Sequence, residues 1–357
     1  MTDKTTTVTP SIDVRAHLRA GQAIPALPLA LTRKRRWDER RQRALVRYYI
    51  DAGAGGLAVG VHSTQFAIRD PQVGLYRPVL QLAAETAGAW RKTSRLTNDF
   101  ALIAGLCGRT RQAVTEARTA RALGYHAGLL SLGAWSRGSE AAVLKHCRRV
   151  AKEIPLVGFY LQPAVGGRVF SYEFWQRFVE IPEVVAVKVA PFDRYRTNDV
   201  VRAVLEAGRD DVALYTGNDD NILGDLLTPF TFGGRTRFFD GGLLGQWGVW
   251  TQRAVQLFRE VQRARTRHRI DPSWLTRNAA WTDANAAVFD SAHGFAGCLP
   301  GIHEVLRRAG LLESVACLDP HEQLSPGQAR EISRVARENP WLTDDAFTSS
   351  NRDRWLQ

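Results

Sequence analysis

The stretch "PEVVAVKVAPFD", residues 182–193, places a single lysine inside an apolar run rich in valine. A short apolar run bounded by proline and aspartate predicts a buried strand over 184–190. Side chains alternate across a strand, so Lys188 would share one face with Val184, Ala186 and Ala190, opposite the valines at 185, 187 and 189. A buried ammonium is costly unless it is paired or neutral. The stretch therefore predicts an amine whose burial serves a function.

Seven other apolar runs share this character, and amphipathic stretches lie between them; the runs cover 24–31, 55–61, 101–106, 127–132, 155–161, 212–217 and 237–243. Thr110, Ser139 and Ser171 each stand where a helix would begin, as N-caps often do. Eight strand-like runs, each followed by a helix-like one, predict a (β/α)8 barrel. A doubly wound open sheet is the alternative, but no glycine-rich dinucleotide fingerprint follows the first run.

The pattern changes near residue 270, after which helical stretches follow one another without strands. We therefore expect a barrel over 1–268, with its catalytic site at the C-terminal ends of the strands, and a helical appendage over 269–357. The last residues, 345–357, are polar, and we expect them to be loosely held.

Composition limits the classes of partner. The chain has 357 residues and a net charge of +12, concentrated in "TRKRRWDERRQR" (32–43) and "RARTRHR" (263–269). This charge favours acidic partners, but neither stretch matches a nucleic-acid-binding motif, so nucleic acid is not the expected partner. No apolar run of about twenty residues predicts a membrane span, and the first residues lack the apolar core of a signal peptide. The four cysteines are widely spaced, which indicates reduced thiols and a cytoplasmic protein.

Tyr160 is the candidate partner of Lys188. In the run 155–161, Leu156, Gly158 and Tyr160 would share one face, and Tyr160 would lie at the same end of the barrel as Lys188. Neighbouring strands are about 4.8 Å apart, so the amine and the phenol could meet over one substrate. A lysine with a lowered pKa is the usual nucleophile for a Schiff base, and a phenol can shuttle protons. The alternative is structural: Lys188 pairs with an inward carboxylate, and Tyr160 packs in the core.

At this point the sequence resembles a known family. The segment "GFYLQPAVGGRVFSYEFWQRFVEIPEVVAVKVAPFD" is similar to the Tyr-x-x-Pro to lysine segment of the class I pyruvate-dependent aldolases, the dihydrodipicolinate synthase and N-acetylneuraminate lyase family. The interval of 28 residues between Tyr160 and Lys188 is in keeping with that family. Weaker likeness extends over about 22–335, including "YTGNDDNI" and "PGIHEVLRRAGLLESVACLDPHEQLSPGQ".

The resemblance implies roles for particular residues. Lys188 would form an imine with a 2-keto acid such as pyruvate, and Tyr160 would be the acid–base group, with no metal or organic cofactor. The turn "GVHSTQF" (60–66) would hold the carboxylate, through His62 and Ser63 or, in a register shifted by one residue, through Ser63 and Thr64. In "YTGNDDNI" the substrate-binding residues would be Asn218 and Asp219. The resemblance also implies a homo-oligomer, either a dimer or a tetramer.

Two departures from the family's pattern narrow the activity. The turn "SLGAWSRGS" carries Trp135 where the family's synthases have a relay tyrosine, and Val165 stands near the place of a substrate-gripping arginine, with Arg168 three residues later. Both argue against dihydrodipicolinate synthesis and favour an aldolase or hydratase-aldolase acting on another 2-keto acid. Trp135, with Phe66 and Trp247, suggests an apolar or aromatic acceptor group, although core packing explains these rings equally well.

Several alternatives stay open. The first is a 2-keto sugar-acid dehydratase on the same scaffold, and the second is a catalytically inactive basic binding protein. A metal-dependent barrel enzyme is a third, but Cys298, His293 and His303 match no structural zinc spacing. The turn "DGGLLGQWG" (240–248) could cradle a phosphate, or it could simply be a tight glycine-rich turn.

Overall fold

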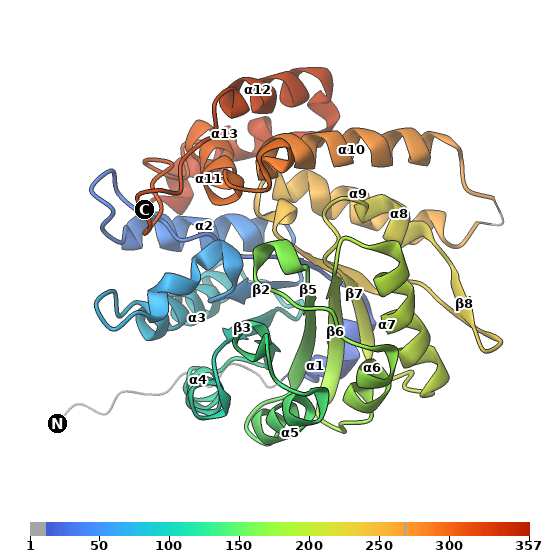
Figure 1. The fold of residues 1–357 in the computed structure, drawn as a ribbon. Helices are drawn as coiled ribbons and strands as arrows, with labels where there is room; N and C mark the ends of the chain where they lie inside the picture. The colour runs from blue at the N-terminus through green and yellow to red at the C-terminus, as the bar shows by residue number, and fades with distance from the viewer. Residues whose placement is uncertain (1–11, 268) are drawn as a thin grey trace.

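Lys188 lies in a ring of eight parallel strands in the computed structural model, which describes residues 12–267 and 269–357 (Figure 1). Seven ladders of backbone hydrogen bonds join the strands, and a parallel bridge between Ala26 and Ala58 closes the ring. The strands are β1 (Ala23–Pro25), β2 (Gly56–Val59), β3 (Ala101–Leu106), β4 (Ala127–Leu130), β5 (Leu156–Leu161), β6 (Val184–Ala190), β7 (Ala213–Thr216) and β10 (Gly241–Leu244). The predicted (β/α)8 barrel is confirmed.

Helices follow the strands around the outside of the ring, namely α2 (Glu39–Asp51), α3 (Tyr76–Thr93), α4 (Thr110–Ala122), α5 (Glu140–Ala151), α6 (Tyr172–Val179), α7 (Arg194–Glu206), α8 (Ile222–Leu227) and α9 (Thr251–Ala264). Ser139 and Ser171 cap α5 and α6 as predicted, because each hydroxyl accepts the backbone N–H of the residue three positions later. Thr110 is not a cap: it is the first residue of α4, and its hydroxyl contacts Nδ1 of His146 at 3.0 Å. A short helix, α1 (Val14–Arg19), precedes β1 and places Leu18 among the barrel's interior side chains.

Two predicted strands were wrong in extent. The first strand ends at Pro25 instead of residue 31, because prolines 25 and 28 cannot donate to a ladder. The last barrel strand is β10, 241–244, instead of 237–243. Part of the predicted run belongs instead to an antiparallel hairpin of β8 (Phe230–Phe232) and β9 (Arg235–Arg237). Its turn is tight because Gly233 and Gly234 adopt φ values of +56° and +75°, which glycine accepts without strain.

Four further helices lie together beside α2, α8 and α9 (Figure 1, orange to red). They are α10 (Ser273–Phe289), α11 (Cys298–Arg308), α12 (Gln328–Glu338) and α13 (Asp345–Trp355). The predicted boundary at 268/269 touches residue 268, which lies outside the described residues; α9 ends before it and α10 begins after it.

The expectation of a loosely held C-terminus was wrong. Residues 345–355 form α13, and the Trp355 ring is fully buried 5.3 Å from the ring centroid of Tyr48. Its indole N–H donates to the carboxylate of Asp51 at 2.7 Å. One buried aromatic anchor is enough to fix a polar helix that carries little apolar surface of its own.

Seven short 3₁₀ helices complete the secondary structure of the described residues: η1 (His62–Thr64), η2 (Phe66–Arg69), η3 (Gly133–Trp135), η4 (Pro163–Val165), η5 (Gln246–Gly248), η6 (Ser291–His293) and η7 (Pro340–Leu342). Within 12–267 and 269–357, no helix combines the length and the apolar character that crossing a membrane requires.

The faces of β6 follow the predicted alternation from Ala186 onward. Ala186 and Ala190 belong to the cluster of side chains inside the barrel, whereas Val187 and Val189 pack against the outer helices. Before Ala186 the prediction was wrong, because the β5–β6 register shifts by one residue between Leu156 and Val157. The irregularity turns Val185 inward and Val184 outward. Lys188 lies beyond the shift, so its inward direction is kept.

Candidate active site

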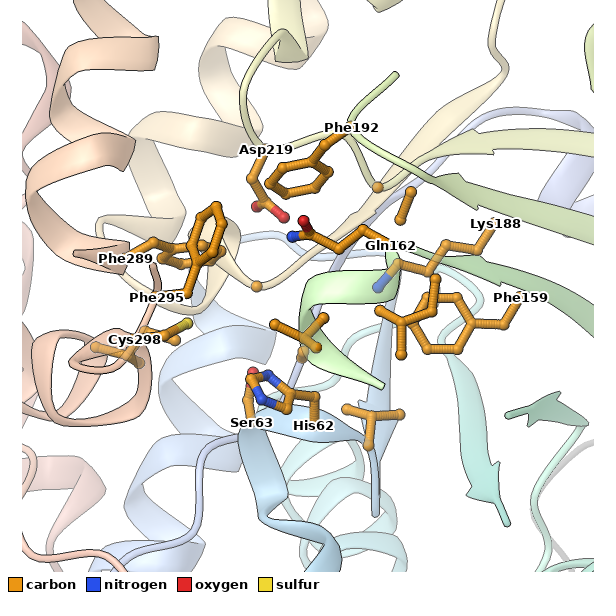
Figure 2. Close-up of a pocket in the computed structure, with 18 residues that line it drawn as sticks. His62, Ser63, Phe159, Gln162, Lys188, Phe192, Asp219, Phe289, Phe295 and Cys298 are labelled. Atoms are coloured by element: carbon orange, nitrogen blue, oxygen red, sulfur yellow. The ribbon is translucent and has the colours of Figure 1, made fainter. Parts of the chain in front are cut away.

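The side chain of Lys188 lines a cavity of about 60 Å³ at the carboxyl ends of the strands. Such a space holds several waters or a small organic molecule, since about 10–15 Å³ accommodates one water. The side chain reaches it by passing Gly217, which follows β7. A Cβ atom on residue 217 would lie 2.5 Å from Cε of Lys188, so only glycine leaves room for the lysine there. Figure 2 shows the lysine extending into the cavity beside Phe159.

Burial lowers the pKa of Lys188, because the ammonium loses its hydration. The carboxylate of Asp219, on the same cavity wall, acts in the opposite direction and favours the charged form. The ring of Phe159 lies 4.5 Å from Nζ, measured to the ring centroid. The amine is therefore closer to its nucleophilic, neutral form than an exposed lysine would be.

Asp219 is held in place from the loop that follows β7. Its Oδ1 accepts the backbone N–H of Gln246 at 2.9 Å, and the Gln246 side chain in turn accepts a hydrogen bond from Asn285 of α10 at 2.9 Å. Burial raises the pKa of Asp219, and the positive charge of Lys188 opposes that shift. A carboxyl group with a raised pKa can give and take a proton near neutral pH.

His62 and Ser63 line the cavity from η1, in the loop after β2, as the first of the two predicted registers requires. Burial, reinforced by the charge of Lys188, lowers the pKa of His62 to about 4, so its imidazole is neutral at neutral pH. Thr64 does not belong to the cavity wall. Its hydroxyl donates to the Leu27 carbonyl at 2.7 Å and accepts the Gly60 N–H at 3.0 Å, so it closes the turn from behind. Of the two predicted registers, the structure therefore brings His62 and Ser63 together at the cavity and leaves Thr64 behind the turn.

Tyr160 is not brought to Lys188, contrary to the prediction. Phe159 pairs with Lys188 in the β5–β6 register, so these two side chains point the same way, and Tyr160 points outward with Val189. Its ring packs 5.0 Å from that of Trp175 on α6, and its hydroxyl accepts the Phe170 N–H at 3.4 Å. Burial raises the pKa of this phenol. The predicted alternation along β5 is correct, but the face that contains Tyr160 was wrongly assigned to the barrel interior, which Val157 and Phe159 occupy.

Asn218 and Trp135 also lie away from the cavity. The Asn218 amide is fully buried and donates to Asp225 and Thr197 at 2.8 and 3.2 Å, while its carbonyl accepts the Phe192 N–H. Trp135 packs between His146 and Arg109, with ring and guanidinium 5.1 and 4.5 Å away. The Asn218 side chain therefore holds the backbone at Phe192, and neither Asn218 nor Trp135 lies on the wall of the cavity that contains Lys188.

The second departure from the family's pattern, Val165 with Arg168, lies in the loop after β5, and the two side chains have different surroundings. Val165 lines the cavity, at the place where an arginine was expected from the resemblance. Arg168 turns away and donates to the carbonyls of Trp135 and Gly138 at 2.7 and 2.6 Å. Among the described residues, the cavity wall contains no arginine.

Core packing accounts for Trp247 and for the neighbouring Gly242. Trp247 is buried 5.8 Å from the Phe258 ring, and a Cβ atom on residue 242 would lie 2.6 Å from its indole. Gly245 is required for another reason, because a Cβ there would lie 2.9 Å from the ring of Phe289. Phe66 contacts His62 and Arg69 instead of the cavity.

Sequence reasoning missed the far wall of the cavity. Its side chains come from the loop after β6 and from the helical C-terminal segment: Phe192, Phe289, Phe295, Cys298 and Ile302. Gln162, after β5, adds a polar group to the wall (Figure 2). No periodicity in the C-terminal segment indicates which of its apolar side chains reaches the cavity around Lys188, more than a hundred residues earlier in the chain.

The cysteine and histidines considered for a metal do not gather. Cys298 lines the cavity, His293 pairs with Asp290 at 2.6 Å, and His303 points to the Val315 carbonyl at 3.3 Å. Across residues 12–267 and 269–357 there is no cluster of three or more metal-ligating side chains.

Comparison with known proteins gives a consistent result. The sequence model of the dihydrodipicolinate synthetase family matches residues 20–231. The chain is 23% identical over 317 residues to N-acetylneuraminate lyase 2 of Escherichia coli O6:H1, covering 88% of this chain and 92% of that protein. It is 26% identical over 189 residues to the 4-hydroxy-tetrahydrodipicolinate synthase of Thiobacillus denitrificans, covering 52% and 58% of the two chains. Among solved structures, YagE of E. coli K12 in complex with pyruvate superposes with a TM-score of 0.72 at 16% identity, covering 90% of this chain and 99% of that one.

Proposed function

The chain belongs to the dihydrodipicolinate synthetase family, and from this membership we propose that it is a lyase that binds a 2-keto acid to Lys188 as an imine. One observation carries the proposal: Lys188 is buried in a cavity at the carboxyl ends of the barrel strands, where burial lowers the pKa of its amine. A neutral amine beside a small cavity is what attack on a ketone requires.

The first step needs only groups on the cavity wall. The carboxylate of the keto acid would lie toward Ser63 and the neutral His62, which can donate a hydrogen bond. The neutral amine of Lys188 then attacks the ketone carbon. The new C–N bond replaces the C–O bond, and the oxygen leaves as water with protons returned by the amine and by a neighbouring acid. Asp219, which lies on the same cavity wall and whose pKa burial raises, is suited to that exchange.

The imine then acts as an electron sink. In a 4-hydroxy-2-keto acid, a base takes the proton of the 4-hydroxyl, the C3–C4 bond breaks, and its electron pair moves toward the imine nitrogen to give an enamine and an aldehyde. Protonation of the enamine carbon and hydrolysis of the imine release the shortened keto acid and restore the lysine. The reverse sequence forms the bond. No step in this scheme requires a metal or an organic cofactor.

A cytoplasmic homo-oligomer, a dimer or a tetramer, is the expected form, and all four cysteines, including buried Cys147 and Cys317, are free. The net charge of +12 would speed encounter with an anionic keto acid.

Borohydride trapping tests the proposal directly. The protein is incubated with pyruvate, reduced, digested and analysed by mass spectrometry. We expect the adduct on the peptide that contains Lys188, its loss in Lys188→Ala, and its retention in Lys145→Ala, which removes an exposed lysine of α5. An adduct at another lysine, or none with pyruvate and a small panel of 2-keto acids, would overturn the mechanism. Appearance of an aldehyde separates cleavage from dehydration.

A further inference from the structure

Two phenylalanines meet over the far side of the cavity, and both adopt a backbone conformation that phenylalanine rarely takes. Phe192, between β6 and α7, has a φ of +53°, and Phe295, between η6 and α11, has a φ of +70°. Their ring centroids lie 6.0 Å apart with the planes at 78°. Left-handed backbone at a bulky residue is strained, and such strain is concentrated at functional sites.

The surrounding structure fixes both backbones independently of each other. The N–H of Phe192 donates to the side-chain carbonyl of Asn218 at 3.0 Å, and Asn218 is itself anchored by Asp225 and Thr197. The N–H of Phe295 donates to the carbonyl of Asp290 at 3.0 Å. These bonds fix the backbone conformation from which each of the two rings projects.

The Asp290 carboxylate organises the second turn. It is almost fully buried and accepts hydrogen bonds from the Gly297 N–H at 2.9 Å, the Ser325 hydroxyl at 2.5 Å and the His293 ring at 2.6 Å. All three partners belong to the C-terminal segment. The hydrogen bonds that fix the turn around Phe295 are therefore independent of the barrel.

The cavity wall is mostly apolar. Val165, Leu161, Phe289 and Ile302 line it as well, while its charged groups are Lys188 and Asp219 and its neutral amide is Gln162. In Figure 2, Lys188 and Phe159 lie on one side of the cavity, and Phe289 and Phe295 lie on the other. A keto acid joined to Lys188 therefore extends its far end toward aromatic rings. A carboxylate or a row of hydroxyls there would exchange its hydration for little more than the single amide of Gln162.

We propose that Phe192 and Phe295 are specificity-determining residues that select an acceptor aldehyde with an uncharged aromatic group. This inference rests on the proposed function, because it concerns the second substrate of the same imine. The preferred reaction is cleavage or formation of a 4-aryl-4-hydroxy-2-keto acid: the C3–C4 bond breaks, its electron pair enters the imine, the 4-hydroxyl proton goes to a base, and an aryl aldehyde leaves.

The test compares the rates at which three aldehydes react with the same keto-acid donor, pyruvate. Pyruvate is supplied with benzaldehyde, with glyceraldehyde or with succinic semialdehyde, and kcat/KM for condensation is measured alongside borohydride trapping of pyruvate alone. We expect benzaldehyde to be preferred over the hydroxylated and the charged aldehyde by about tenfold or more, because a polar group placed in an apolar site usually lowers kcat/KM by at least that factor.

The variants are Phe192→Gly and Phe295→Gly, since glycine keeps the left-handed backbone without strain while removing the ring. Each should lower kcat/KM for benzaldehyde by about tenfold more than it lowers the rate of pyruvate trapping. Tyr195→Ala is the matched control, because this aromatic residue lies in the first turn of α7 near Phe192 but is 83% exposed. Phe295→Leu should restore part of the loss and shows that the turn still folds.

Each outcome has one meaning. Trapping of pyruvate at Lys188 with no preference for benzaldehyde, or with equal effects of the variants on all aldehydes, overturns the aromatic selection and leaves the proposed function standing. Absence of any Lys188 adduct overturns the proposed function itself.

Discussion

The amine of Lys188 lies 4.5 Å from the centroid of the Phe159 ring, and these two residues are direct partners in the β5–β6 register. The side chain that follows, Tyr160, is thereby turned to the outer face of the barrel, against α6. In the proposed mechanism, proton transfer around the imine would fall to groups that share the cavity with Lys188, chiefly Asp219 and His62.

Removing the Tyr160 hydroxyl should therefore leave chemistry nearly intact. In Tyr160→Phe we expect the rate of pyruvate trapping to fall less than about threefold, the effect of an interaction worth under about 1 kcal/mol. The free energy of unfolding should drop by about 0.5–1.5 kcal/mol, because the Phe170 N–H loses an acceptor. Tyr125→Phe, which removes a buried hydroxyl bonded to the Leu80 carbonyl, is the control for stability. A hundredfold loss of trapping would show that the phenol does enter the cavity during the reaction.

The pH dependence of the trapping rate should follow the protonation of the Lys188 amine. Only neutral Lys188 attacks, so the rate should rise with pH through a pKa below the ordinary lysine value. Asp219 favours the ammonium, so Asp219→Asn should lower the pKa further and move the rising limb to lower pH. Initial trapping rates measured across the pH range check this in both proteins. Asp353→Asn removes an exposed carboxylate and should leave the pH at which the rate rises unchanged. A shift of that rise to higher pH in Asp219→Asn would contradict the inference that Asp219 stabilises the Lys188 ammonium.

Gly217 offers a test that does not touch a reactive group. In Gly217→Ala the new Cβ would overlap the Lys188 stem at 2.5 Å, so the amine should be displaced from its productive position. We expect trapping to slow roughly a hundredfold, as misplacement by about 1 Å commonly does. Gly88→Ala in α3 is the matched control, because a Cβ there meets no atom within 4 Å. Equal trapping rates in the two variants would show that the lysine tolerates crowding at residue 217.

The C-terminal helix should contribute strongly to stability. Trp355→Ala removes a fully buried ring and its hydrogen bond to Asp51, so we expect a decrease of about 3–5 kcal/mol in the free energy of unfolding. Urea denaturation followed by circular dichroism measures it. Leu275→Ala, at a side chain that is 74% exposed, should change the value by less than about 0.5 kcal/mol. A similarly small effect for Trp355 would mean that α13 is not part of the cooperative unit.

The sequence by itself determined the barrel and the direction of its lysine. Eight apolar runs alternate with amphipathic stretches, and these local periodicities depend on neighbouring residues only. Lys188 points inward because Ala186 and Ala190 on its own face leave room for it, which can be read within seven residues. Ser139 and Ser171 mark helix starts for an equally local reason.

Only the tertiary structure decided which side chain lies beside Lys188 and which residues form the far wall of its cavity. A two-residue period predicts which side chains share a face but not which face lies inside. In β5 the face of Val157 and Phe159 lies inside, and the face of Leu156 and Tyr160 packs against the outer helices. The cavity's far wall depends on contacts between the barrel and residues 289–302, more than a hundred positions after Lys188. Such contacts arise from the packing of whole helices, and no local pattern in the chain encodes them.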